Sequence, residues 1–306
     1  MSGREMVVQR PVPGEPRPYE FPTTFRTMLG NGLRVIVTPM PGRELIAASL
    51  ALRAGAVDEP ADVGGATVLA ARGLTEGTEV RDAIALVEAA ERLGASLHAE
   101  SGWDATSAGL DVPASRLEPA LELLAEVVRR PSFPEAEIER LRDERLTDLL
   151  QAKADPRRRA DEAYVSSVYA SSSPYHRPAG GSAETVEGLT SAELRAVHAR
   201  AYRPSHGALV LAGDVDPDEV ARLAGALFGD WSGPDVSLTV GPRRIDYRRR
   251  GGAFDSASVR TTFRGLSGND IVYGTRGRNV LRVDVPPHRV GKAWKMTVEG
   301  RELQRR

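Results

Sequence analysis

The chain contains no cysteine, which excludes disulfide bonds, thiolate zinc sites and cysteine nucleophiles together. It also has no apolar run that approaches the roughly 20 residues of a membrane-spanning helix. The first residues carry charges and prolines where a secretory leader would have an apolar segment. We therefore expect a soluble, cytoplasmic protein that has no membrane partner.

Charge of the two signs is nearly balanced overall but unevenly distributed along the 306 residues. Residues 235–306 hold 16 Lys and Arg against 7 Asp and Glu, a net charge of +9, which leaves −10 for residues 1–234 out of the total of −1. This asymmetry and the proline distribution predict three parts. They are a Pro-rich extended lead-in (1–22), a folded domain (23–234) and a basic Gly/Arg-rich tail (235–306).

Hydrophobic periodicity in the folded domain predicts locally paired strands with helices between them. Strands at 25–29 and 33–38 are joined at Asn31-Gly32, a pair that favours the positive φ angles of a tight hairpin. A helix is expected to open at Ser115 with a capping box to Glu118. The other strands are expected at 46–52, 95–111 (a hairpin) and 208–213, and the other helices at 64–74, 80–93, 134–155, 157–169, 191–202 and 217–228.

The predicted fold class is α+β, a mostly antiparallel sheet with helices packed on one face. It is followed by an irregular basic tail that holds at most short strands near 258–263, 270–273 and 280–285.

Two apolar stripes are expected to face the core. The stripe residues are Ala83, Leu86, Val87, Ala90 and Leu93 in one helix, and Leu117, Leu121, Leu124 and Val128 in the next.

Four motifs resemble those of a known peptidase family. The segment Gly65–Thr78, GATVLAARGLTEGT, resembles without a gap the signature that reads roughly G-x-A-H-F-L-E-H-M-x-F-x-G-T. Further on, Ser173–Pro178 resembles an H-P-Y-G-R-P element, Tyr202–Pro204 a Y-R-P element, and Leu211–Val215 a closing strand. On these motifs the chain resembles the first domain of the pitrilysin, insulinase and mitochondrial-processing-peptidase family, of the non-catalytic subunit type.

The resemblance implies where a zinc site would lie. In the family, two His at i and i+4 of a helix bind Zn²⁺, a Glu between them acts as base, and a distant Glu is the third ligand. The two His positions are Val68 and Arg72 here, the base position is Ala71, and the third-ligand position falls on Asp148. Val68 and Ala71 have no donor atoms and Arg72 stays protonated. The resemblance thus implies a pseudo-metallopeptidase with no catalytic residue, metal ligand or cofactor.

Two further hypotheses depend on the same resemblance. Arg72 replaces the lost cation and pairs with Asp148; the alternative is that both side chains point apart into solvent. The segment His98-Ala99-Glu100-Ser101 aligns with the family's edge strand, which pairs with the substrate backbone in active relatives. The alternative there is an ordinary edge strand kept soluble by Glu100.

The family context leaves three functions open. The first is a non-catalytic subunit that forms a heterodimer with a catalytic homologue and helps to bind peptide. The second is a scaffold or interaction protein that uses the basic tail. The third, an active hydrolase with a different site, is supported by no Ser-His or Cys-His signature.

The tail itself has three candidate origins. It is a remnant of the family's second domain, an unrelated fused segment or an altered reading frame. Aromatic residues alternate with its basic ones, but no nucleic-acid motif is present, which favours a solvated tail over a nucleic-acid partner.

Overall fold

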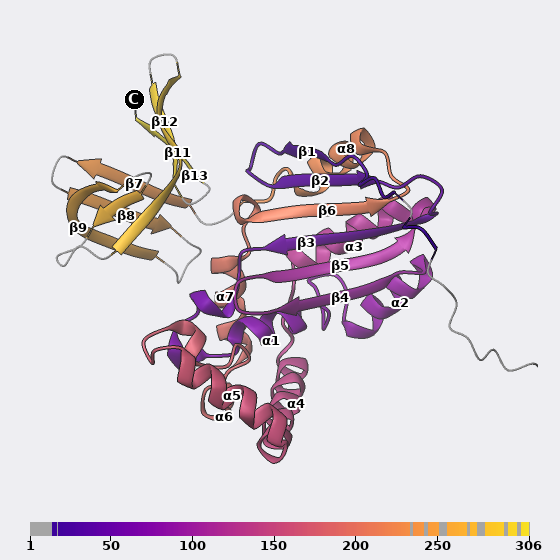
Figure 1. Cartoon of the computed structure of the whole chain (residues 1–306), viewed down its shortest axis with the longest axis horizontal. Coiled ribbons are helices and arrows are strands. Elements are labelled where there is room, and N and C mark those ends of the chain that lie inside the picture. The colour runs from indigo at the N-terminus through magenta and orange to yellow at the C-terminus, as the bar shows by residue number, and fades with distance from the viewer. Residues whose placement is uncertain are drawn as a thin grey trace, which may run out of the picture.

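The structure is a computed structural model that describes residues 14–16 and 18–232 with their side chains, and the backbone of strands between 235 and 305. It contains two sheets, and helices are associated with the first (Figure 1). The predicted α+β class is confirmed. Most of the lead-in expected at 1–22 lies outside the described residues, and its described part has neither helix nor strand.

The first sheet has the strand order β1-β2-β6-β3-β5-β4 and is mostly antiparallel, as predicted. Its one parallel pair joins β2 and β6, so the closing strand of the domain lies between the first hairpin and β3. β1 and β4 are the two edges. The strands are β1 (Phe25–Met28), β2 (Arg34–Pro39), β3 (Leu45–Leu52), β4 (Ser96–Ser101), β5 (Thr106–Pro113) and β6 (Gly207–Gly213).

The helices cover one face of this sheet and continue below its β4 edge. Figure 1 shows α2, α3 and α8 behind the strands, with α1 next to β4 and with α4 and α5 projecting beyond it. No helix of the described residues is both long and apolar enough to cross a membrane. The α-helices are α1 (Ala66–Gly73), α2 (Ala83–Leu93), α3 (Leu117–Arg129), α4 (Glu135–Ala154), α5 (Pro156–Val168), α6 (Ala183–Val186), α7 (Ser191–Ala201) and α8 (Pro217–Phe228), and the 3-10 turns are η1 (Ala56–Asp58), η2 (Ala61–Val63), η3 (Ala114–Arg116), η4 (Pro174–His176) and η5 (Pro204–His206).

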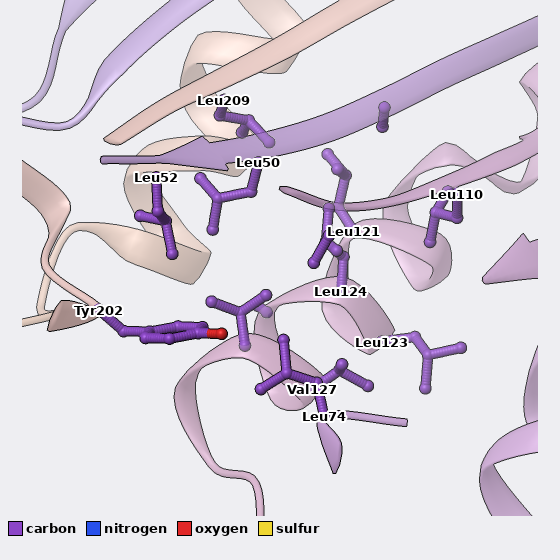
Figure 2. Packing of buried hydrophobic residues seen from close by; sticks show 14 of the residues in the cluster. Leu50, Leu52, Leu74, Leu110, Leu121, Leu123, Leu124, Val127, Tyr202 and Leu209 are labelled. Carbon is purple, nitrogen blue, oxygen red and sulfur yellow. The ribbon is translucent and has the colours of Figure 1, made fainter. Parts of the chain in front are cut away.

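The core lies between the sheet and the helices. Every second residue of β3, from Ile46 to Leu52, is buried, and so is the predicted stripe of α3. Figure 2 shows leucines of β3, β5 and β6 meeting Leu121 and Leu124 of α3, with Tyr202 beneath Leu52. One stripe prediction is wrong, because Val87 of α2 is 56% exposed. Leu86 and Ala90 are the fully buried residues of this helix.

The first hairpin forms where predicted, but by a different turn. Only Gly32 has a positive φ (88°), and Leu29 pairs with Leu33 across a three-residue loop. The Asn31 amide instead donates to the carbonyl oxygens of Phe228 and Trp231, at 2.6 and 3.0 Å. Asn31 therefore fixes the C-terminal end of α8 rather than supplying a left-handed residue.

The capping box expected at Ser115 is also wrong. The segment 114–116 forms η3, and α3 begins at Leu117 with no side-chain cap. Capping boxes occur instead at Ser182 before α6 and at Thr190 before α7. The motif predicts a helix start only where the chain enters in extended conformation, as it does at both of these residues.

The second sheet occupies the region expected to be an irregular tail. Seven strands follow one another as an antiparallel meander, where the sequence predicted only three short strands. Side chains of this region, including its aromatic ones, lie outside the described residues. The strands are β7 (Asp235–Gly241), β8 (Arg244–Arg250), β9 (Ser256–Ser267), β10 (Asp270–Tyr273), β11 (Asn279–Val290), β12 (Ala293–Val298) and β13 (Arg301–Arg305).

Candidate functional site

Helix α1 is held at its N-terminus by a buried carboxylate. Gly65 precedes the helix with φ +96°, a conformation that L-residues with a side chain rarely adopt. The Glu59 carboxylate, 5% exposed, accepts from the backbone N–H of Gly65 at 2.8 Å and of Thr67 at 3.0 Å. A remote Glu thus satisfies the free N–H groups of α1 and places a negative charge at the positive end of the helix dipole.

The three signature positions of α1 differ in exposure. Val68 is half-buried, Ala71 is completely buried, and the Arg72 side chain is 40% exposed. Val68 and Arg72 lie one turn apart on the same helix face. That face therefore presents an isopropyl group and a guanidinium.

Arg72 does not pair with Asp148, and that hypothesis is wrong. Its Nη2 atom donates to Oε2 of Glu144 at 2.9 Å. Glu144 lies on α4 one turn before Asp148, and its side chain is one methylene longer than that of Asp148. The Arg72 guanidinium therefore contacts α4 one turn before Asp148, the residue that the hypothesis assigned as its partner.

Asp148 has two other partners. Arg158 of α5 donates to it at 2.8 and 3.2 Å, and Arg145 of α4 donates at 2.5 Å. The hydrogen bond from Arg158 is the main reason that the pKa of Asp148 lies below its usual value. Both oxygens of this carboxylate are thus occupied by guanidinium groups.

Arg140 of α4 extends the ion-pair network around α1. It contacts Glu137 at 2.9 Å, Glu76 at 2.6 Å and Glu144 at 2.5 Å, and these contacts raise its pKa further above the usual arginine value. These contacts form a continuous chain of ion pairs through Arg72, Glu144, Arg140 and Glu76. The chain links α1 and the turn that follows it to α4.

An open depression of about 570 Å³ lies along this side of α4.

The side chains at these positions do not fit a zinc ion. A catalytic Zn²⁺ takes three protein ligands from His, Cys, Asp or Glu. Of the four aligned residues only Asp148 is such a donor, and both its oxygens carry guanidinium partners. Across residues 14–16 and 18–232, no group of three or more such side chains is placed to hold a metal ion.

The predicted edge segment lies where the resemblance places it. Residues 98–101 belong to β4, which pairs on one side with β5 and is the last strand of the sheet. Gly102 N–H bonds to Ala105 at the hairpin end, and bonded pairs alternate along an antiparallel ladder. The N–H and C=O groups of Leu97, Ala99 and Ser101 therefore point away from β5, toward the open edge.

The side chains of β4 divide between two faces. Leu97 and Ala99 are partly buried against the core, while His98 and Glu100 are exposed on the other face. The His98 ring lies near Gly109, its partner on β5, where an added Cβ would lie 2.7 Å from the Ala48 carbonyl oxygen and 3.1 Å from the imidazole. A side chain at 109 would therefore clash first with the backbone of β3.

Comparisons with known proteins agree with this geometry. The family model described as "Insulinase (Peptidase family M16)" matches residues 34–178, and "Peptidase M16 inactive domain" matches residues 188–297. The chain belongs to the M16 peptidase family. The second match crosses from the first sheet into the second, so it spans the boundary near 234 that charge and composition suggest.

Curated relatives of this M16 chain are longer than the chain itself. An uncharacterized zinc protease of Mycobacterium leprae is 29% identical over 204 residues, which cover 67% of this chain and 46% of the relative. A probable mitochondrial-processing peptidase subunit beta of Arabidopsis thaliana is 27% identical over 210 residues, 68% of this chain and 39% of the relative. The chain thus spans less than half the length of these relatives.

Solved structures support the fold. A peptidase M16 inactive domain from Pseudomonas fluorescens has a TM-score of 0.66 at 25% identity, over 72% of this chain and 54% of that one. A protease from Helicobacter pylori has the same TM-score at 20% identity, over 73% and 54%.

Three residues of the site were not predicted from sequence. Glu59, Glu144 and Arg158 each complete an interaction around α1 or α4. Glu144 had a usable signal, because it lies four residues before Asp148 and so shares its helix face. Glu59 and Arg158 had none, since their positions depend on how separate segments pack.

Proposed function

We propose that this chain is a catalytically inactive M16 subunit that forms a heterodimer with an active homologue and helps to bind its peptide substrate. One observation carries the proposal. The helix face that would hold a metal carries Val68 and Arg72, and Arg72 is engaged with Glu144. Neither side chain is a metal donor, and Ala71 has no carboxylate to activate water.

Peptide binding would use the open edge of β4. Strand addition requires free backbone N–H and C=O groups in extended conformation, and Leu97, Ala99 and Ser101 provide them. The side chains of Val68, Ala71 and Arg72 belong to α1, so their identity removes no backbone group from this edge. Substrate binding can therefore persist without catalysis.

The open edge of β4, together with signature positions whose side chains do not fit zinc, supports pairing with an active homologue. A cytoplasmic location stays a prediction from the cysteine-free composition.

Co-expression tests the heterodimer directly. The chain is produced with an M16 homologue from the same genome that carries an intact H-x-x-E-H motif, and each is also produced alone. We expect the two to co-purify and to cleave a casein or peptide substrate in a chelator-sensitive way that neither shows alone. Independent migration of the two chains in gel filtration, with no gain of activity, would contradict the proposal.

A second candidate is a scaffold that acts through the basic segment without a protease partner. The observation that favours it is the +9 charge of residues 235–306, beside −10 for the rest. Affinity purification of the full chain distinguishes the two. Recovery of acidic partners but no M16 homologue favours the scaffold, and partners that remain after deletion of 235–306 count against it.

A further inference from the structure

A cluster of three aromatic side chains lies at the hairpin that follows β4. Trp103 is at the hairpin tip, Tyr175 is in η4, and Tyr169 caps the end of α5. The Trp103 and Tyr175 rings are 5.4 Å apart between centroids, and the Tyr175 and Tyr169 rings 5.5 Å. Tyr175 thus lies between the other two, and three segments far apart in sequence meet at the end of the edge strand.

The backbone around this cluster is fixed. The carbonyls of Gly102 and Trp103 accept from Ala56 and Val57, at 3.0 and 2.9 Å. A Cβ on Gly55 would lie 2.0 Å from the Trp103 carbonyl oxygen. The β4–β5 hairpin therefore packs against the backbone of Gly55 so closely that no side chain fits between them. The His176 Nδ1 atom lies 2.9 Å from the Tyr169 carbonyl oxygen. The backbone segments that carry Trp103 and Tyr175 are therefore held by contacts within the chain.

Two carboxylates accompany the rings. The Tyr175 hydroxyl donates to Oδ1 of Asp104 at 2.5 Å, and this bond raises the pKa of Tyr175, so the phenol stays neutral. Asp58 is also close enough to influence Tyr175. Within the part of the chain that has described side chains, neither Asp58 nor Asp104 forms an ion pair, and Oδ2 of Asp104 accepts no hydrogen bond.

The surface therefore combines electron-rich ring faces with two carboxylates that form no ion pair among the described side chains. The neighbouring Arg177 guanidinium donates to the carbonyl oxygens of Ala56 and Glu59, at 3.2 and 2.6 Å. Tyr169 is 43% exposed and Trp103 and Tyr175 are partly exposed, so ring surface is accessible. Aromatic faces attract ammonium and guanidinium groups within about 6 Å, and nearby carboxylates add to that attraction. This composition differs from α4, where every carboxylate named above already has an arginine partner.

We propose that Trp103, Tyr175 and Tyr169, together with Asp104 and Asp58, bind an ammonium or guanidinium group carried by a peptide that lies along β4. The inference rests on the proposed peptide-binding function, because β4 leads directly into the hairpin that carries Trp103. A peptide added to the edge would pass the cluster as it leaves the strand. The cation can be a Lys or Arg side chain or the peptide's own N-terminus.

Binding of matched peptides to the full chain tests the proposal. The probes are fluorescent extended eight-residue peptides with one Lys, or norleucine in its place, each with a free or an acetylated N-terminus. We expect the wild type to prefer a cationic peptide by about three- to tenfold, and more at low salt. Loss of the preference on Lys→norleucine identifies the side chain as the cation, and loss on acetylation identifies the N-terminal ammonium.

Variants assign the preference to the cluster. Trp103→Ala and Asp104→Asn should each reduce it to near unity while peptides still bind. Asp104→Asn keeps an oxygen acceptor for Tyr175, so the hairpin is preserved even if Trp103→Ala disturbs it. Tyr164→Ala is the matched control, because Tyr164 is a 69% exposed tyrosine of α5 outside the cluster, and it should leave the preference unchanged.

The outcomes separate this inference from the proposed function. Peptides that bind with equal affinity whatever their charge would overturn the cation site and leave peptide binding intact. If no peptide binds, the proposed function fails, and N-acetyl-arginine amide then tests the site alone through the fluorescence of Trp103. A fluorescence change in the wild type that Trp103→Ala abolishes supports the cation site, and no change overturns it.

Discussion

At the scale of single residues, the region around α1 shows how one side chain can replace another without keeping its partner. Arg72 occupies a position that the family resemblance assigns to a ligand, yet it bonds to Glu144 and not to Asp148. Asp148 meanwhile bonds to Arg145 and Arg158. All of these side chains are partly exposed, and exposed ion pairs contribute only about 0 to 1 kcal/mol each. The network therefore orients side chains more than it stabilises the fold.

Gly65 gives a residue-scale prediction of stability. Its φ of +96° is unfavourable for any residue with a Cβ, and that Cβ would lie 2.8 Å from the Gly180 carbonyl oxygen. Gly65→Ala should therefore lower the free energy of unfolding by about 1 to 3 kcal/mol, measured by urea denaturation. Gly225→Ala is the control, because nothing lies within 4 Å of its added Cβ in α8. An equal effect of both substitutions would contradict the role of backbone conformation at Gly65.

At the scale of elements, most of the first domain could be predicted from the sequence. The alternation in β3 and the stripe of α3 predicted buried faces, because burial follows directly from strand and helix periodicity. The helix expected at 80–93 does end at Leu93, where Gly94 caps α2 with φ 65°. Local patterns were sufficient wherever the determining interaction lies within one element.

Elements were predicted poorly where distant segments decide the outcome. Asn31 was assigned to a turn, but its amide holds the end of α8 almost two hundred positions further along the chain. Val87 was assigned to the core, but no other element of the described chain covers that side of α2. The same limit applies to the site: the aligned positions could be located, whereas the partner of Arg72 depends on how α1 packs against α4.

The edge strand gives a prediction at this scale. Ala99→Pro removes an N–H group that points away from β5, so the β4–β5 ladder should persist. We expect peptide affinity to fall by about tenfold, from one lost hydrogen bond and the changed edge, in a fluorescence binding assay. Ala99→Val retains the N–H group and should bind as the wild type does. Unchanged affinity in a folded Ala99→Pro protein would show that peptides bind elsewhere.

At the scale of the whole molecule, the chain combines a peptidase-type domain with a second sheet of opposite net charge. The first domain supplies the edge strand and the aromatic cluster. The M16 inactive-domain match extends to residue 297, although the sequence alone left three origins open for the region after 234. Strand backbones there follow the order of a simple meander, which local pairing of successive strands can produce.

The central claim is that the α1–α4 region forms no zinc site, and metal content tests it most directly. The full chain is purified without chelators, incubated with excess Zn²⁺, desalted and analysed by elemental mass spectrometry, beside an M16 homologue with an intact motif. The account predicts zinc well below one ion per chain here and close to one in the homologue. Stoichiometric zinc in this chain, lost when Asp148 is changed to Asn, would contradict it.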